Sequence, residues 1–302
     1  MKISVVMTTY NGKKYVEEQL DSIRIQTRTA DEVLIFDDLS SDGTAQFIQN
    51  YIDSNKLSDW EIRVNAINKG WKKNFFDGIQ ETTGDVIFLC DQDDIWVPDK
   101  IEKMIQVLEQ NKKISVLASD YSIKLEGEKR SNYQSVARKM KITGKVEMIP
   151  FDQKWYYVTR PGSTYCFRKT FFDEIKKDWD VNRAHDCNLW YFASVKDEMA
   201  IYHYITMIFR RHGDNASTEH LDTVDKRYQA TKMAKDVNEF FLSKVSSGKD
   251  VILKEIIAFC DLRMRFFSSR KMLDWCRLFL YYRSYYLTTK GCLADLICKK
   301  ER

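Results

Sequence analysis

The first hundred residues of the chain switch repeatedly between short apolar runs and stretches in which apolar residues recur at helical spacing. The runs predict buried strands, because a strand covered on both faces is apolar at consecutive positions. The predicted strands are residues 2–9, 32–36, 61–66 and 87–90. The helices expected between them are residues 13–27, which Asn11 would cap, a segment ending at residue 51, and residues 74–82. This alternation predicts an α/β fold with a mostly parallel, Rossmann-like sheet flanked by helices.

Beyond residue 112 the pattern is less regular, and after residue 220 it becomes helical to the end of the chain. Strands are predicted at residues 114–118 and after the turn at Pro161-Gly162, a polar loop at residues 121–136, and helices at residues 170–177 and 189–195. We therefore expect a domain at residues 1–220, in two parts that meet near residue 112, followed by an α-helical extension at residues 221–302.

Polar side chains follow each of the four N-terminal strands. They form the clusters Thr8-Thr9-Tyr10, Asp37-Asp38, Asn68-Lys69-Gly70 and Asp91-Gln92-Asp93-Asp94. Because crossover connections bring the carboxyl ends of parallel strands to one edge of the sheet, we expect the clusters to converge there. Ordinary loop polarity explains any one cluster equally well. Together they favour a ligand site without a glycine-rich phosphate loop, since the chain contains neither Gly-x-Gly-x-x-Gly nor Gly-Lys-Ser/Thr.

The fourth cluster places three carboxylates within four residues at the end of an apolar run. Like charges repel, and each carboxylate loses solvation at a buried strand end, so the arrangement is costly unless a cation or ligand offsets it. The pair Asp91 and Asp93 suits a hard divalent ion, Mg²⁺ or Mn²⁺, with phosphate oxygens completing its shell. The alternative is an acidic turn that caps a helix beginning near Asp99, and this stretch alone favours neither interpretation.

Composition and charge bear on compartment and partners. The seven cysteines include no Cys-x-x-Cys pair, which disfavours a disulfide framework and a cysteine zinc site. No apolar run has the length of a signal peptide or a membrane span, so we expect a cytoplasmic protein. Residues 262–302 hold ten Lys or Arg, three Asp or Glu, and eight aromatic residues. This end predicts peripheral contact with the inner membrane face, or a helical appendage that packs on the first domain or on a second subunit.

The motifs together resemble the family 2 glycosyltransferases with the GT-A fold, and most of all the bacterial rhamnosyltransferases of polysaccharide and O-antigen assembly. The resemblance covers roughly residues 1–220. Its first segments are Ser4–Gly12, Glu18–Ile23, Asp37–Thr44, Asn68–Gly70 and Gly84-Asp85. Its later segments are Asp91–Trp96, Pro161–Tyr165, His185-Asp186 and Arg211–Asn215. One departure is Leu39, because the family usually has Gly after the paired acids, and this difference would alter the local turn.

The resemblance implies a role for each matching position. Residues 1–112 would bind a nucleotide-diphosphate sugar, and residues 113–220 would bind the acceptor. The nucleotide and the donor sugar would contact Thr8, Tyr10, Asp38, Asn68, Lys69, Asp91, Asp94 and Trp96. Asp93 and His212 would bind a divalent metal, Mn²⁺ or Mg²⁺, that bridges the diphosphate. Asp186 would be the general base of a single displacement that inverts the anomeric carbon.

Two assignments have ordinary structural alternatives. Asp186 stands beside the apolar stretch Leu189–Phe192, which would raise its pKa toward the range of a useful base, but it could equally cap a helix. Trp155, Tyr156 and Trp190 are candidates for an aromatic surface on which the acceptor sugar stacks, although core packing is the commoner role of such residues.

The leading function hypothesis is transfer of L-rhamnose from dTDP-L-rhamnose to a lipid-linked or growing cell-envelope polysaccharide. The alternative within the same reaction class is transfer from a UDP-hexose. A nucleotidyltransferase also has acids at a sheet edge, but residues 9–13 are a poor version of the basic glycine-rich loop that it needs. A non-enzymatic protein that binds membrane or nucleic acid through its basic end would leave the four clusters unexplained, so we expect no nucleic-acid partner.

Overall fold

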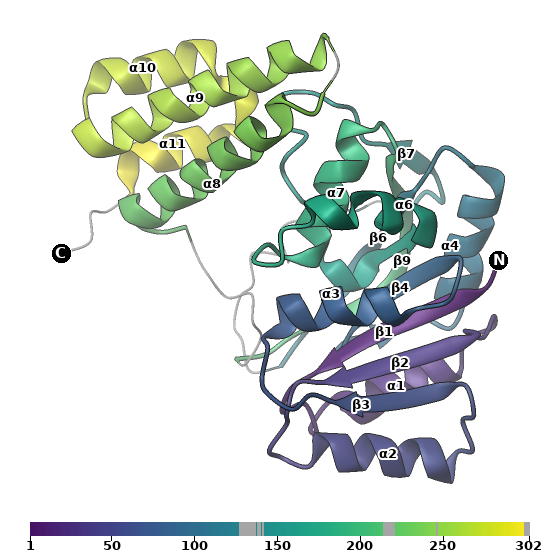
Figure 1. The fold of residues 1–302 in the computed structure, drawn as a ribbon. Coiled ribbons are helices and arrows are strands. Elements are labelled where there is room, and N and C mark those ends of the chain that lie inside the picture. Colours follow the sequence, from purple (N-terminus) through teal and green to yellow (C-terminus); the bar gives the residue numbers. More distant parts are fainter. Residues whose placement is uncertain (127–136, 138–139, 141, 214–220, 246, 299–302) are drawn as a thin grey trace. The chain divides into compact units, whose positions relative to one another are not determined.

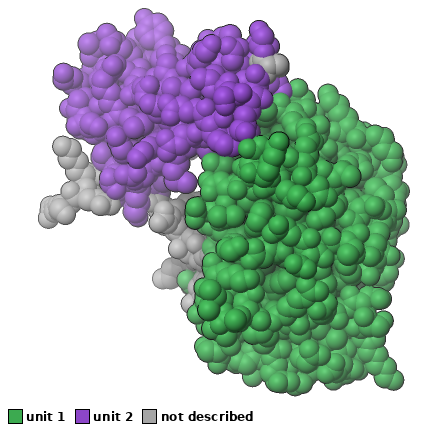
Figure 2. Space-filling model, viewed as in Figure 1, with its two compact units in different colours: residues 1–149, 159–215 green, residues 150–158, 216–302 purple. Residues whose placement is uncertain are grey.

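The computed structural model describes residues 1–126, 137, 140, 142–213, 221–245 and 247–298 (Figure 1). Internal contacts divide the chain into two compact units (Figure 2). The sheet unit comprises residues 1–149 and 159–215, and the helical unit comprises residues 150–158 and 216–302. Residues 150–158 thus group with the C-terminal helices, whereas the sequence analysis placed them in the first domain.

One sheet runs through the sheet unit, with nine strands in the part of the chain that the structure describes. The strands are β1 (Ile3–Thr9), β2 (Glu32–Asp37), β3 (Trp60–Val64), β4 (Val86–Asp91), β5 (Ile95–Trp96), β6 (Val116–Leu125), β7 (Val146–Met148), β8 (Tyr165–Arg168) and β9 (Met199–Arg211). Strands β3-β2-β1-β4 pair in parallel in that order. Antiparallel β8 then joins β4 to β6, which pairs in parallel with β9, and β5 and β7 lie antiparallel to β9. The predicted α/β class and its parallel N-terminal sheet are confirmed.

Helices cover both faces of the parallel strands. In the sheet unit they are α1 (Val16–Arg24), α2 (Thr44–Ser54), α3 (Trp71–Glu81), α4 (Lys100–Gln110), α6 (Lys169–Ile175) and α7 (His185–Val195). Helices α1 and α2 lie on one face of β1 and β2 and α3 lies on the other, as right-handed crossovers require (Figure 1). A Cβ on Gly78 of α3 would lie 2.9 Å from Val6 and 2.8 Å from Phe36, so glycine permits this helix to approach the sheet closely.

Two local predictions are wrong. The first helix begins at Val16 with Tyr15 before it, so Asn11 does not cap it. Asn11 instead has a φ of +48° and accepts a hydrogen bond from the Ser41 amide. Strand β6 continues to Leu125 into the predicted polar loop, because its outer half pairs with β9. Residues 127–136 of that loop lie outside the described residues.

The helical unit contains α8 (Val224–Leu242), α9 (Lys249–Ser269), α10 (Met272–Tyr281) and α11 (Thr289–Ile297). None of the described helices combines the length and the apolar character that a bilayer span requires. The basic-aromatic stretch 262–286 is divided between the end of α9, α10 and the 3₁₀ turn η3 (Arg283–Tyr285), so it is not one interfacial helix. Several of its aromatic rings, including Phe266, Phe267 and Tyr286, are buried inside the unit.

Candidate active site

The carboxyl ends of β1, β2 and β4 lie side by side at one edge of the sheet. The parallel register places Thr8 of β1 opposite Asp91 of β4, and Thr9 opposite Asp37 of β2. The Thr9 hydroxyl donates to Asp37 at 2.7 Å, which ties the first two strand ends together. Three of the predicted clusters therefore meet, as the strand order alone requires.

Asp38 holds the Asn68-Lys69-Gly70 cluster in place. Its carboxylate accepts hydrogen bonds from the backbone amides of Lys69 and Gly70, both at 2.8 Å, and from Asn65 Nδ2 at 2.9 Å. The side chain is buried, with 2% of its surface exposed. Asp38 therefore orders the loop that carries Asn68 and Lys69, which is a role the sequence analysis did not anticipate.

Gln92 joins the loop after β4 to the loop after β1. The Tyr10 amide donates to Gln92 Oε1 at 2.9 Å, and Gln92 Nε2 donates to the Tyr10 carbonyl at 3.0 Å. A Cβ at Gly12 would lie 2.0 Å from Gln92 Oε1, so glycine leaves the space that this pair of bonds needs. Tyr10 itself is half exposed at the end of β1.

The turn after β2 is bound to the same loop. Asn11 donates its amide to Ser40 Oγ at 2.9 Å, and the Gly12 amide donates to Thr44 Oγ1 at 2.9 Å. Between Asp38 and Ser40, Leu39 adopts a φ of +66° with about half of its side chain exposed. This left-handed conformation favours glycine. With Leu at position 39 the chain still makes the turn, and the backbone of Leu39 is strained.

The two predicted metal ligands contact each other. His212 Nε2 lies 2.9 Å from Asp93 Oδ2, although the residues are far apart in the sequence. The imidazole of His212 stacks on Tyr15 with ring centroids 4.3 Å apart. Arg210 Nε donates to the Asp93 carbonyl at 2.8 Å and so fixes the backbone of the acidic loop. The strand β9 and the loop after β4 thus deliver one nitrogen and one carboxylate oxygen to the same point.

This pair fits a hard divalent ion that takes its remaining ligands from diphosphate and water. Within the described residues, no group of three or more His, Cys, Asp or Glu side chains converges as a metal site. A full protein cage is not required, because Mg²⁺ at phosphate sites keeps several waters and uses only one or two protein ligands. Mn²⁺ accepts the same carboxylate and phosphate oxygens.

Asp94 points into the protein. It is fully buried, and its carboxyl group accepts hydrogen bonds from the Ser163 hydroxyl and, at 3.1 Å, from the Arg210 amide. Burial, with the charges of Asp93 and Asp91 beside it, raises the pKa of Asp94 well above its usual range. The expectation that Asp94 faces the donor sugar is therefore not supported by its position.

Lys100 is a buried cation that the sequence analysis missed. Its ammonium group donates to the Ser163 carbonyl and lies 4.1 Å from the centroid of the Trp96 ring. Burial lowers the pKa of Lys100 to about 8. Its only sequence cue was its place beside Asp99, where a surface helix was expected to begin.

Asp91 and Asp186 are two further acids close enough for their charges to interact. Burial, together with the neighbouring charges of Asp93 and Asp186, raises the pKa of Asp91 to about 7. Burial likewise raises the pKa of Asp186, in the first turn of α7, to about 6. The Cys187 amide donates to Asp186 Oδ1 at 2.7 Å and orients the carboxylate.

His185 is a packing residue beside this acid. Its ring lies 4.1 Å from that of Phe75, centroid to centroid, and neither of its nitrogens has a hydrogen-bond partner in the described structure. Burial lowers the pKa of His185 to about 3, so the ring is neutral. A Cβ at Gly162 would lie 1.9 Å from His185 Nε2, which shows how closely the Pro161-Gly162 turn packs on α7.

The aromatic residues proposed to contact sugars are buried. Trp96 and Trp190 are each 2% exposed in the sheet unit. Trp155 is 1% exposed in the helical unit, where its Nε1 donates to Asn238 at 3.0 Å, and Tyr156 is 6% exposed. None of these rings presents an open face, so the structure does not support their roles as donor or acceptor contacts.

Comparisons with known proteins bear on the fold and on the kind of reaction. The family model of "Glycosyl transferase family 2" matches residues 4–194. The dTDP-rhamnosyl transferase RfbG of Shigella flexneri is 32% identical over 225 residues, which cover 69% of this chain and 72% of that protein. Among solved structures, Staphylococcus aureus TarS 1–349 in complex with UDP-GlcNAc has a TM-score of 0.66 at 18% identity, and the match covers 98% of this chain and 81% of that one. The mannosyltransferase PcManGT of Pyrobaculum calidifontis, in complex with GDP-Man and Mn²⁺, has a TM-score of 0.57 at 13% identity, with coverages of 98% and 86%.

Proposed function

The chain belongs to glycosyl transferase family 2 and has the GT-A fold, and from this premise we propose that it transfers L-rhamnose from dTDP-L-rhamnose, with inversion, to a hydroxyl of a lipid-linked or growing cell-envelope polysaccharide. The observation that carries the proposal is that the Asp93–His212 pair, Asp91 and Asp186 gather at the carboxyl edge of the sheet. The choice of rhamnose is supported by the relative in Shigella flexneri, whose name gives it a dTDP-rhamnosyl activity.

Asp186 is the proposed general base. The acceptor hydroxyl must lose its proton as it attacks the anomeric carbon, and a carboxylate on the acceptor side accepts it. A pKa of about 6 leaves Asp186 ionised at neutral pH and more basic than an ordinary aspartate. The hydrogen bond from the Cys187 amide fixes the direction in which the carboxylate faces.

Asp93 and His212 are the proposed metal ligands. When bound, a divalent ion supplies Lewis-acid stabilisation to the negative charge that develops on the leaving diphosphate. The protein's part is to hold the two donors rigidly, through the stacking of Tyr15 on His212 and the hydrogen bond from Arg210 to the Asp93 carbonyl.

The nucleotide is proposed to bind over the clustered loops. Thr8 and Tyr10 stand at the end of β1, and Asp38 holds Asn68 and Lys69 beside them through the backbone of their loop. Asp91 is the proposed contact to the ribose or the donor sugar. The nucleobase and the sugar of the donor are then bound by preorganised loops and not by a glycine-rich loop at a helix N-terminus.

The lipid-linked acceptor implies work at the inner face of the cell membrane. The helical unit is the proposed contact, because α10 exposes large apolar side chains. Their exposed fractions are 52% for Met272, 64% for Leu273, 70% for Leu280 and 74% for Tyr281. A homodimer formed through the same surface is the alternative use of these residues.

The donor is tested by thermal stabilisation with a panel of nucleotide sugars. The panel contains dTDP-L-rhamnose, UDP-glucose, UDP-GlcNAc and GDP-mannose, each with Mn²⁺, with Mg²⁺ and with EDTA. We expect dTDP-L-rhamnose with a divalent ion to raise the melting temperature most, because binding to the folded state alone stabilises it. A larger shift with a UDP-sugar would make a UDP-hexose the proposed donor in place of dTDP-L-rhamnose. No shift with any nucleotide sugar would contradict the proposed function.

A further inference from the structure

Many basic side chains of the helical unit form salt bridges with acids of the same unit. Arg227 and Arg263 both pair with the buried carboxylate of Asp295, at 2.9 and 2.6 Å. Arg265 and Arg277 pair with Asp274, at 3.1 and 3.8 Å. Lysines on α8 and α9 pair likewise with acids on these helices. Part of the positive charge found in the sequence is therefore compensated within the unit, so the number of Lys and Arg residues does not by itself describe a basic outer surface.

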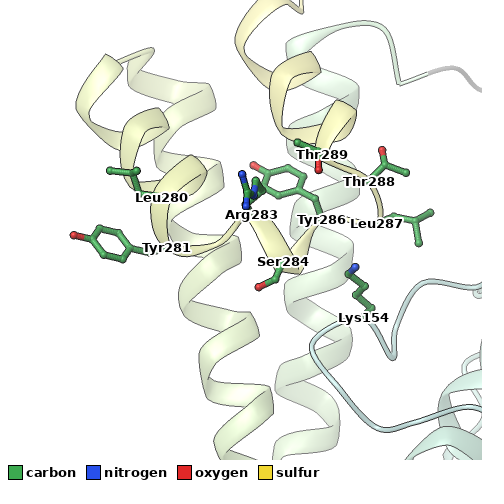
Figure 3. A pocket seen from close by; sticks show the side chains of 9 residues that line it. All are labelled: Lys154, Leu280, Tyr281, Arg283, Ser284, Tyr286, Leu287, Thr288 and Thr289. Atoms are coloured by element: carbon green, nitrogen blue, oxygen red, sulfur yellow. The ribbon is translucent and has the colours of Figure 1, made fainter.

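Lys154 and Arg283 are exceptions. Within the described residues, neither of them forms a salt bridge with an acid, and the guanidinium carbon of Arg283 lies 5.6 Å from the centroid of the Phe279 ring. Both side chains line one cavity of about 390 Å³, which they reach from different segments, residues 150–158 and η3 (Figure 3). The hydroxyl groups of Ser284, Thr288 and Thr289 line the same cavity. Two uncompensated cations and three hydroxyl groups suit a phosphate or diphosphate.

The same cavity has apolar walls that are open to solvent. Leu280 is 70% exposed, Tyr281 is 74% exposed and Leu287 is 51% exposed. Exposed side chains of this size, gathered beside uncompensated cations, fit a ligand that has an anionic end and an apolar chain. The volume is within the range of small-molecule sites, roughly 300–1,000 Å³.

A neighbouring cavity of about 570 Å³ shows the contrast. It is also lined by arginines, Arg265 and Arg277, but both of these pair with Asp274, and Asp261 contributes a further carboxylate to its lining. Its charges are therefore balanced, and an anion gains little there. The charge imbalance distinguishes the cavity that contains Lys154 and Arg283.

We propose that this cavity binds the phosphorylated end of a lipid, with the phosphate groups on Lys154 and Arg283 and the first part of the lipid chain against Leu280, Tyr281 and Leu287. The inference rests on the proposed function and deepens it, because it assigns the lipid phosphate of the acceptor to a site in the helical unit. Recognition is by charge and apolar contact together, so neither half of the ligand alone binds as well.

The test is calorimetric titration of the full chain with farnesyl diphosphate, inorganic pyrophosphate and farnesol. EDTA is present throughout, so that a diphosphate does not bind through a metal at Asp93. We expect farnesyl diphosphate to bind at least about tenfold more tightly than either fragment, since each fragment keeps only one kind of contact. Equal affinity for pyrophosphate, equal affinity for farnesol, or no binding of farnesyl diphosphate would overturn the proposal.

Variants locate the site. Lys154→Gln and Arg283→Gln should each weaken farnesyl diphosphate binding about tenfold, because each removes a charged contact to phosphate. The charge-conserving variants Lys154→Arg and Arg283→Lys should retain most of the affinity. Lys232→Gln, which removes an exposed charge from α8 away from the cavity, is the matched control and should bind like the parent protein. Unchanged affinity in both cavity variants would place the ligand elsewhere.

Two further readouts separate this inference from the proposed function. dTDP should not displace farnesyl diphosphate, and Asp93→Ala should still bind it; failure of either result would assign the ligand to the nucleotide site. Vesicles of phosphatidylglycerol test whether the partner is a bilayer surface. If the cavity variants lose vesicle binding and the parent protein does not bind farnesyl diphosphate, the cavity is not a lipid-phosphate site. If nucleotide sugars fail to bind while farnesyl diphosphate binds, the proposed function fails and the lipid site stands.

Discussion

His212 Nε2 lies 2.9 Å from Asp93 Oδ2, so two residues 119 positions apart in the sequence form one polar contact at the edge of the sheet. The contact is nearly closed to solvent on the histidine side, where 5% of His212 is exposed. A polar pair in such a place is preorganised, since the stacked ring of Tyr15 and the Arg210 side chain leave it little freedom.

Removing either member of this pair should abolish the response to metal. Asp93→Asn and His212→Ala are expected to lose the extra stabilisation that Mn²⁺ adds to dTDP binding, and to lower sugar transfer about a hundredfold. Thermal shift with and without EDTA measures the first effect, and release of dTDP measures the second. Asp173→Asn, which changes a surface acid on α6, is the control and should behave as the parent does. A full metal response in Asp93→Asn would remove the metal site from this position.

Transfer should depend on the ionisation of Asp186. Because a base acts only when deprotonated, kcat/KM should rise about tenfold per pH unit below the pKa of about 6 and lose that slope above it. Asp186→Asn should reduce transfer at least about a hundredfold while donor binding is kept, because an amide accepts no proton. Asp180→Asn, a neighbouring loop acid, is the control. A variant Asp186→Asn that transfers sugar normally would exclude Asp186 as the base.

The same substitution should stabilise the fold at alkaline pH. The folded-state pKa of Asp186, about 6, lies above the ordinary value of 3.8, so the folded protein binds this proton more tightly than the unfolded chain does. The corresponding stability is present below pH 3.8 and is lost as the pH rises through 6. Asp186→Asn avoids the loss and should gain on the order of 2 kcal/mol in unfolding free energy at pH 8. Urea unfolding at pH 4 and pH 8 measures the difference, which should shrink at the lower pH.

Asp94 should tolerate an amide but not truncation. Burial raises the pKa of Asp94 and so favours the neutral carboxyl group, whose size and neutrality Asp94→Asn preserves. Asp94→Ala leaves the Ser163 hydroxyl and the Arg210 amide unpaired in the interior and should cost about 3 kcal/mol in unfolding free energy. Urea unfolding of the two variants tests this. If Asp94→Asn folds normally but no longer binds the donor, then Asp94 contacts the sugar after all.

Replacing Leu39 by glycine should relieve backbone strain at the turn after β2. Its φ of +66° costs an L-residue free energy that glycine does not incur. Leu39→Gly and Leu39→Ala both remove the exposed side chain, and only glycine removes the strain. We expect the glycine variant to be the more stable of the two by about 1 kcal/mol. Equal stability in thermal and urea unfolding would show that the turn is not strained.

The parallel sheet and the polar residues at its carboxyl edge followed from the sequence. Apolar runs separated by helical spacing predict parallel strands, and parallel strands place Thr8, Asp38 and Asp91 at one edge regardless of packing detail. The acidic motif was recognised from three carboxylates within four adjacent residues, and Asp186 from the family resemblance; the roles assigned to them stay predictions. The residues at each strand end are consecutive in the sequence, so they can be read from it directly.

Which way each side chain faces was decided only by the tertiary structure. Asp93 and Asp94 are neighbours in the sequence, but in the turn between β4 and β5 one contacts His212 and the other is buried on Ser163. Lys154 and Arg283 are far apart in the sequence, and their shared cavity exists only because residues 150–158 pack with the C-terminal helices. Sequence patterns record local periodicity, whereas such pairings depend on long-range packing that no short segment contains.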